Sequence, residues 1–162
     1  MKSFSKTLLA LYVLCLLWLI LFKTSLDLFA VLDHQKSSLN LIPFAHHSGA
    51  NSREMIDNLI VFIPLGLLLS VNFKRASLWR KLALVGFLSL TAEMLQFALA
   101  IGVADITDVL MNIFGGLIGL TLYEVSHRHI HSEKLDRFIV VTSAVLLILC
   151  MLLRFMVLKV RY

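Results

Sequence analysis

Apolar residues form five long runs along this chain, separated by polar segments. The runs cover Thr7–Phe22, Leu59–Phe73, Leu82–Ile101, Val109–Tyr123 and Phe138–Leu158. The third and fifth runs reach the roughly 20 residues that an upright helix needs to cross the hydrocarbon core of a bilayer. A shorter run can also span when the polar residues at its end lie in the headgroup zone. The pattern therefore predicts about five transmembrane helices.

The composition supports an all-α integral membrane bundle without a soluble domain. Hydrophobic residues make up 59% of the 162 residues, charged residues only 15%, and the mean hydropathy is +0.89. A soluble core of this length could not bury so much apolar surface. We therefore expect residues 1–162 to form a single transmembrane domain that is embedded in the lipid bilayer.

The net charge of +5 comes from short clusters of Lys and Arg between the apolar runs. This placement is typical of topology signals, so we do not expect nucleic-acid binding. With the N-terminus in the cytoplasm, the inside segments hold nine basic residues, Lys2, Lys6, Lys74, Arg75, Arg80, Lys81, Arg128, Lys134 and Arg137. The outside segments hold five, Lys23, Lys36, Arg53, Lys159 and Arg161. The count predicts a cytoplasmic N-terminus and a long first extracytoplasmic loop.

Polar side chains interrupt the third and fourth apolar runs. Glu93 and Gln96 lie inside the third run, Asp105 and Asp108 close the following turn, and Asn112 enters the fourth run. An ionisable residue at membrane depth is costly and is a functional-site hypothesis by default. Helical spacing places these residues on one face of each helix, so the two faces can meet. We predict that Glu93 and Asn112 meet in a wet hollow that opens to the cell exterior.

Two interpretations are open for the acidic residues. Asp105 suits a helix N-cap, and Asp108 lies in the first turn, where negative charge complements the helix dipole. Alternatively, both residues hold a divalent cation, because sites with only oxygen ligands favour Mg²⁺ or Ca²⁺. We predict no other cofactor. Glu93 is either a hydrogen-bonded buried acid or the candidate catalytic residue, a proton carrier or general acid/base.

Small residues follow in the fourth run. Gly115, Gly116 and Gly119 are expected to pack against a neighbouring helix, because small residues let membrane helices approach closely. The stretches 58–66 and 112–119 also echo each other, since each begins with asparagine and ends with glycine. Paired short segments of this kind occur in transporters built from repeats. A small proton-coupled transporter that uses Glu93 is one alternative.

The order of these motifs resembles the VanZ-like family of bacterial membrane proteins. The resemblance covers residues 40–123 and rests on Asn40-Leu-Ile-Pro-Phe44, Asn58-Leu-Ile-Val-Phe-Ile-Pro-Leu-Gly66, Glu93-x-x-Gln96 and Asp105-x-x-Asp108-x-x-x-Asn112-x-x-Gly115-Gly116-x-x-Gly119. Family members often carry an arginine ahead of the acidic pair, whereas this chain has Ile101-Gly-Val-Ala104 there. If that arginine binds an anionic ligand, another residue such as Arg53 would have to supply the contact here.

The resemblance implies a multi-pass protein of the bacterial cytoplasmic membrane. The named member of the family is an accessory factor in resistance to glycopeptide antibiotics, especially lipid-bearing ones of the teicoplanin type. We therefore expect a non-enzymatic protein that binds an amphiphilic small molecule or the head group of an envelope lipid in an outward-facing polar pocket. The candidate ligand-binding residues are Asn40, Asn58, Glu93, Gln96, Asp105, Asp108 and Asn112.

An enzyme is the second alternative. It would act on a lipid-linked cell-envelope precursor, with Glu93 as acid/base and with Asp105 and Asp108 holding a cation. The sequence disfavours this alternative. No serine or cysteine lies within the polar cluster beside a histidine that could act as its base. The expected outer segments also lack a basic cluster that could receive pyrophosphate.

Overall fold

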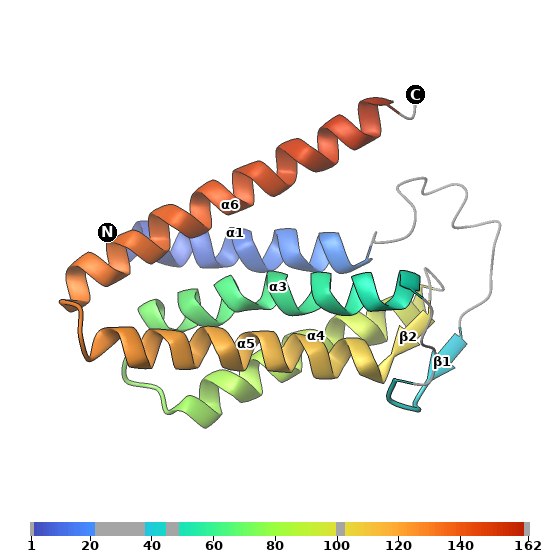
Figure 1. Ribbon diagram of the computed structural model, residues 1–162, viewed down its shortest axis with the longest axis horizontal. Coiled ribbons are helices and arrows are strands. Elements are labelled where there is room, and N and C mark those ends of the chain that lie inside the picture. Colours follow the sequence, from blue (N-terminus) through green and yellow to red (C-terminus); the bar gives the residue numbers. More distant parts are fainter. Residues whose placement is uncertain (1, 22–37, 45–48, 100–102, 161–162) are drawn as a thin grey trace.

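The computed structural model describes residues 2–21, 38–44, 49–99 and 103–160, and it is mainly helical (Figure 1). In chain order the elements are α1 (Lys2–Leu21), β1 (Ser38–Asn40), α3 (Gly49–Asn72), α4 (Leu78–Ala98), β2 (Val103–Asp105), α5 (Ile106–His127) and α6 (Ser132–Val160). Within the described residues, five helices are long and apolar enough to cross a membrane. The predicted all-α membrane bundle of five helices is thus confirmed.

The helices extend beyond the apolar runs at their polar ends. The second begins at Gly49 instead of Leu59, and the last begins at Ser132 instead of Phe138. Hydropathy detects only the part of a helix that lies in hydrocarbon, whereas the backbone hydrogen bonds continue into the headgroup zone. Pro64 lies inside α3, where helix packing accommodates it.

Two short strands, which the sequence analysis did not predict, lie at one end of the bundle. β1 and β2 pair in parallel, and the register places Asn40 opposite Asp105. A strand of three residues is too short for an alternating hydrophobic pattern to be detected. We call this end, where α1 and α4 finish and α3 and α5 begin, the strand end of the bundle.

The central pair of helices, α3 and α5, run side by side in the same direction (Figure 1). Gly115 lies against Leu59, and one turn further along both helices Gly119 lies against Ile63. A Cβ atom at either glycine would be 2.1 Å from the facing backbone carbonyl oxygen. The stretches 58–66 and 112–119, which echo each other in sequence, are therefore neighbours in the structure.

The outer helices α1 and α4 run antiparallel to the central pair. The Tyr12 hydroxyl donates to the Val61 carbonyl oxygen at 2.7 Å, and Asn72 Nδ2 donates to the Ser5 carbonyl oxygen at 3.3 Å. α4 packs against α5 through side chains such as Ser89, which contacts Asn112 of α5. The chain thus contains a helix–strand–helix unit twice, as α1–β1–α3 and as α4–β2–α5.

The glycines of α5 pack as predicted, but most of them meet α3. Gly115 and Gly119 contact the α3 backbone, whereas Gly116 lies against the Val85 side chain of α4. Gly66 of α3 completes the contact, because a Cβ there would be 2.3 Å from the Gly116 carbonyl oxygen. The α5 face that carries the glycines is therefore shared between two helices.

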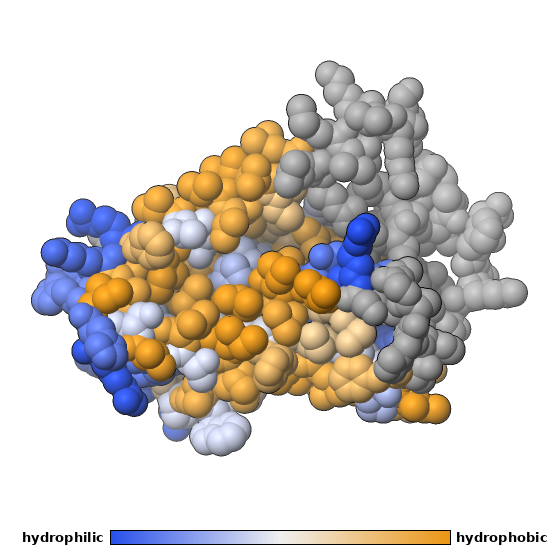
Figure 2. Space-filling model, viewed as in Figure 1, coloured by the Kyte–Doolittle hydropathy of each residue, from blue (hydrophilic) through white to orange (hydrophobic). Residues whose placement is uncertain are grey.

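An apolar band surrounds the middle of the bundle. Figure 2 shows it on the visible face, with hydrophilic residues gathered at the left end, opposite the strands. The most deeply buried apolar side chains are Phe62, Leu65, Leu68, Leu69, Val85, Ala92 and Leu120. Because large apolar side chains such as Phe87, Phe138 and Ile148 point outward instead, the surface suits a hydrocarbon environment.

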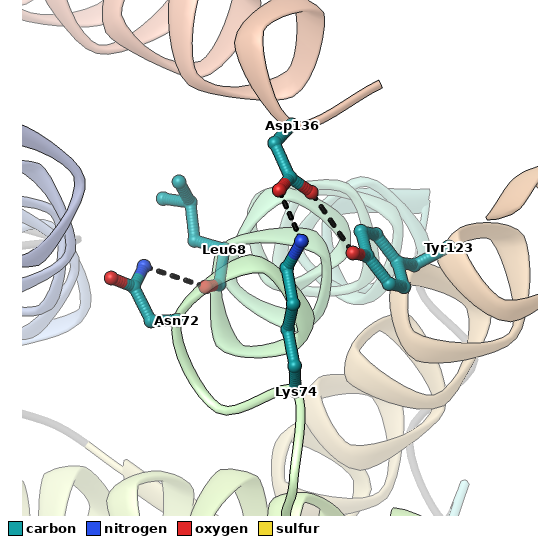
Figure 3. Close-up of polar contacts among 5 residues, drawn as sticks. All are labelled: Leu68, Asn72, Lys74, Tyr123 and Asp136. Atoms are coloured by element: carbon teal, nitrogen blue, oxygen red, sulfur yellow. Dashed lines mark hydrogen bonds and ion pairs between the residues drawn. The ribbon is translucent and has the colours of Figure 1, made fainter. Parts of the chain in front are cut away.

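Polar contacts hold helix α6 against the bundle at the end opposite the strands. Figure 3 shows Asp136 of α6 between two partners from other elements. The Tyr123 hydroxyl of α5 donates to Asp136 Oδ1 at 2.9 Å, and Lys74, in the α3–α4 connection, forms an ion pair with Oδ2. Asn72 Nδ2 caps the end of α3 by donating to the Leu68 carbonyl oxygen at 2.8 Å.

Candidate functional site

Asn40 and Asp105 end the two paired strands and make the same local contact. Asn40 Oδ1 accepts a hydrogen bond from the Ile42 N–H at 3.2 Å, and Asp105 Oδ1 accepts one from the Thr107 N–H at 2.7 Å. Each is a side-chain contact to the backbone two residues on, as asparagine and aspartate often make in turns. The two side chains also join each other, because Asn40 Nδ2 donates to Asp105 Oδ2 at 3.0 Å.

Asp105 is the N-cap of α5, which confirms the structural interpretation of this residue. Both of its carboxylate oxygens accept hydrogen bonds, as described above. Asp108 follows in the first turn of α5, where its charge complements the helix dipole. In the described part of the chain no three His, Cys, Asp or Glu side chains gather as metal ligands. A divalent cation at Asp105 and Asp108 stays a prediction.

Thr107 ties the loop after β1 to the start of α5. Its hydroxyl accepts a hydrogen bond from the Phe44 N–H at 3.0 Å, and its side chain is buried. Phe44 has a φ of 58°, in the left-handed region that a bulky residue rarely adopts. A conformation of this kind persists only where surrounding contacts hold it. Thr107 was not among the candidate site residues predicted from the sequence, although its position two residues after a capping aspartate was a usable signal.

Glu93 connects α4 to the strand pair. Only 5% of its surface is exposed, and its Oε2 accepts a hydrogen bond from the Asp105 N–H at 3.1 Å. Asp105 is therefore the centre of the cluster. Its backbone N–H binds Glu93, and its side chain binds Asn40 and the Thr107 backbone. The expectation that Glu93 and Asp105 belong to one polar cluster agrees with this geometry.

Gln96 lies on the same face of α4 but reaches a different helix. Its Nε2 donates to the Ile20 carbonyl oxygen of α1 at 2.9 Å. Because a carbonyl can only accept, this contact identifies which end of the amide carries the nitrogen. Among the described residues, Gln96 Oε1 is buried and has no hydrogen-bond partner. Leaving such an acceptor unsatisfied costs about 1–3 kcal/mol.

Asn112 lies deeper in the bundle. Its Nδ2 donates to the Ser89 hydroxyl of α4 at 2.9 Å, and none of its surface is exposed. Glu93 and Asn112 thus hydrogen-bond to different groups, although both lie between α4 and the second strand–helix segment. Their meeting in a wet hollow stays a prediction. Asn58, on the neighbouring α3, is also buried.

The side chains that the structure describes at the strand end are mainly acids and amides. Among the side chains that the structure describes, Arg53 is the single Lys or Arg at this end, and it is exposed. The basic residues at the opposite end are Lys6, Lys74, Arg75, Arg80, Lys81, Arg128, Lys134 and Arg137. The polar cluster therefore offers mainly hydrogen-bond acceptors.

A second polar contact, which the sequence analysis did not list as a site, lies at the opposite end. Lys81 in the first turn of α4 is 4% exposed, and its Nζ lies 3.4 Å from Ser70 Oγ and 3.8 Å from the exposed Glu124 carboxylate. The buried ammonium group of Lys81 is thus paired with polar groups of α3 and α5, and it links α4 to both helices near the membrane surface. Its signal in sequence was only a basic residue directly before the third apolar run, Leu82–Ile101.

The fold and the cluster define a class: a multi-pass membrane protein of five helices with acid and amide side chains buried at one end. Comparison with known proteins identifies the family. The family model for VanZ/LLP1 matches residues 9–127, so the chain belongs to that family. The chain is also 49% identical to Protein VanZ of Enterococcus faecium over 153 residues, 94% of each chain. No solved structure matches.

Proposed function

We propose that this protein binds an amphiphile at the strand end, with the polar part of the ligand held by the cluster around Glu93 and Asp105. The observation that carries the proposal is the junction of buried polar groups with exposed apolar ones. Glu93, Asp105, Asn40 and Thr107 are linked by hydrogen bonds at the strand pair. A ligand with a polar head and an apolar tail suits such a boundary.

The apolar side of this boundary is the segment that follows β1. Leu41, Ile42 and Phe44 are all exposed, as is Leu39 within the strand. The segment is held over the polar cluster by Asn40 and by the bond from Phe44 to Thr107. Exposed apolar side chains that are held in place beside polar groups are typical of a binding surface.

Orientation supports an outward-facing site. The described Lys and Arg residues gather at the end opposite the strands, and such residues are enriched on the cytoplasmic side of membrane proteins. We therefore assign the strand end to the outer face of the bacterial cytoplasmic membrane. There the cluster would meet amphiphiles that arrive from outside or that lie in the outer leaflet.

Membership of the VanZ/LLP1 family indicates which class of ligand to propose. Since the family resemblance implies resistance to glycopeptide antibiotics, we propose that the protein captures lipid-bearing glycopeptides of the teicoplanin type. The lipid-linked cell-envelope precursor is the other amphiphile that such a surface would meet. Capture would keep the drug in the membrane surface and away from its target.

Expression in a glycopeptide-susceptible bacterium tests this function. We expect the wild-type chain to raise the inhibitory concentration of a lipid-bearing glycopeptide and to leave that of a non-lipidated one nearly unchanged. Glu93→Gln should remove the protection. Met94→Leu is the matched control, because Met94 is the next residue on α4 and is 70% exposed. Equal protection against both drug classes would contradict amphiphile capture.

A further inference from the structure

We propose that the turn after β1 is inserted into the lipid leaflet at the strand end, so that its apolar side chains contact acyl chains and not water. We call residues 39–44 the apolar turn. Its four large apolar side chains are 44–68% exposed, namely Leu39, Leu41, Ile42 and Phe44. Residues 38–44 include no charged residue. The partner is the bilayer itself, so this inference goes beyond the proposed function and does not need an amphiphile.

Helix α5 shows which side of the molecule contacts lipid near the apolar turn. Leu110, Phe114 and Val125 are 41%, 54% and 58% exposed. Phe114 follows Leu110 by four residues and precedes Val125 by eleven, a spacing that places all three on one face of the helix. Because α5 is long and apolar enough to cross a membrane, this exposed apolar face contacts lipid.

The apolar turn covers the beginning of that face. Thr107 lies three residues before Leu110 and therefore on the same face of α5, but it is only 4% exposed. Its hydroxyl accepts a hydrogen bond from the Phe44 N–H at 3.0 Å, and Figure 1 shows the turn beside the start of α5. The turn thus occupies a position that lipid would otherwise take. Its exposed apolar side chains continue the lipid-contacting face of α5 toward the strand end.

The backbone of the apolar turn is prepared to leave water. The Ile42 N–H donates to Asn40 Oδ1 at 3.2 Å, and the Phe44 N–H donates to Thr107 Oγ1. Pro43, which lies between them, has no N–H. All three positions from 42 to 44 are therefore free of an N–H that needs water as its partner. Such pairing is required of a segment in a lipid environment, where an unpaired N–H is costly.

The apolar turn is also fixed at both ends, so its side chains cannot fold back onto the protein. Asn40 Nδ2 donates to Asp105 Oδ2 at 3.0 Å at the beginning of the turn. Phe44, at its end, is held at a φ of 58° by the contact with Thr107. The turn is therefore a rigid anchor in the leaflet. An amphiphile in the same leaflet would meet the turn and the cluster around Asp105 together.

Fluorescence quenching in nanodiscs tests the position of the apolar turn. The two native tryptophans, Trp18 and Trp79, are first replaced by phenylalanine. Ile42→Trp is then introduced, because Ile42 is 68% exposed and its side chain takes part in none of the hydrogen bonds of the turn. Phe114→Trp in the same background is the reference, since Phe114 lies seven residues after Thr107 and so about 10 Å deeper along α5. The quenchers are lipids with bromine near the head group, lipids with bromine near the end of the acyl chain, and acrylamide in the water.

We expect the Ile42→Trp variant to be quenched about twofold or more by the head-group-side bromines, and Phe114→Trp to be quenched best by the deeper ones. Acrylamide should quench Ile42→Trp severalfold less than it quenches dissolved N-acetyltryptophanamide. Leu41→Trp, at a site that is 66% exposed, should behave like Ile42→Trp.

Two results would overturn the insertion of the apolar turn. Strong acrylamide quenching of Ile42→Trp and Leu41→Trp without quenching by either lipid would place the turn in water. Protection of both variants from all three quenchers would show that protein, such as a second copy of the chain, covers the turn. Lipid quenching of Phe114→Trp in the same background confirms that the bundle is inserted, so neither result could be ascribed to misfolding. Both results would leave amphiphile binding standing, because no amphiphile is present in this experiment.

Discussion

Gly119→Ala tests the contact between α3 and α5 on which the fold depends. A Cβ atom at Gly119 would lie 2.1 Å from the Ile63 carbonyl oxygen and 3.1 Å from the Gly66 Cα atom. Nonbonded heavy atoms attract best at ~3.5 Å, so relieving the 2.1 Å contact fully would separate the helices by roughly 1.4 Å. Because backbone atoms cannot rotate away as a side chain can, α5 itself must move.

Two opposing effects determine how much Gly119→Ala changes the free energy of unfolding. Inserting a methyl group into a packed contact costs about 1–3 kcal/mol, and a clash with backbone belongs at the upper end of that range. Replacing glycine by alanine inside a helix returns about 1 kcal/mol. We therefore expect Gly119→Ala to lower the free energy of unfolding by about 2 kcal/mol.

Gly86→Ala is the matched control. A Cβ atom at Gly86 would lie 3.6 Å from the Ile113 side chain, which is an ordinary contact. This variant should be as stable as the wild type or about 1 kcal/mol more stable. Unfolding by SDS in mixed micelles, followed by tryptophan fluorescence, measures both variants. Equal stability of Gly119→Ala and Gly86→Ala would refute the close approach of α3 and α5.

Three further tests address individual hydrogen bonds, and each is measured by the same unfolding titration. Asp105→Ala removes a helix cap and the bond to the β1 strand, so it should destabilise by about 2 kcal/mol, whereas Asp105→Asn should cost less. Ser89→Ala and Asn112→Leu should show a coupling energy of about 0.6 kcal/mol in a double-mutant cycle, and additive effects would argue against their contact. Tyr123→Phe should lower stability by about 1 kcal/mol, and no effect would show that its bond to Asp136 does not hold α6.

The membrane bundle could be predicted from the sequence because hydropathy over about 20 residues is a strong signal. Hydropathy does not mark the helix ends, since α3 begins at Gly49 in a stretch that carries Arg53 and Asp57. The strand pair was missed because three residues carry no usable pattern. The pairing of Asn40 with Asp105 joins residues 65 positions apart, which no local pattern encodes.

The candidate site was partly predictable for the same reasons. The cap formed by Asp105 follows a local rule, and the glycine positions of α5 predicted close packing. The sequence did not indicate that Gly119 would meet α3, nor that Gln96 would reach the Ile20 carbonyl of α1. Such contacts depend on how the helices are arranged around one another, which the spacing within one helix does not determine.

The binding of a lipid-bearing glycopeptide to the purified protein in nanodiscs tests whether the cluster around Glu93 captures an amphiphile. Empty nanodiscs set the baseline, a non-lipidated glycopeptide serves as the comparison drug, and Glu93→Gln is the decisive variant. We expect saturable binding of the lipid-bearing drug alone, weakened about tenfold or more by Glu93→Gln and unchanged by Met94→Leu. Equal binding of both drugs, or binding that Glu93→Gln leaves intact, would contradict amphiphile capture by this cluster.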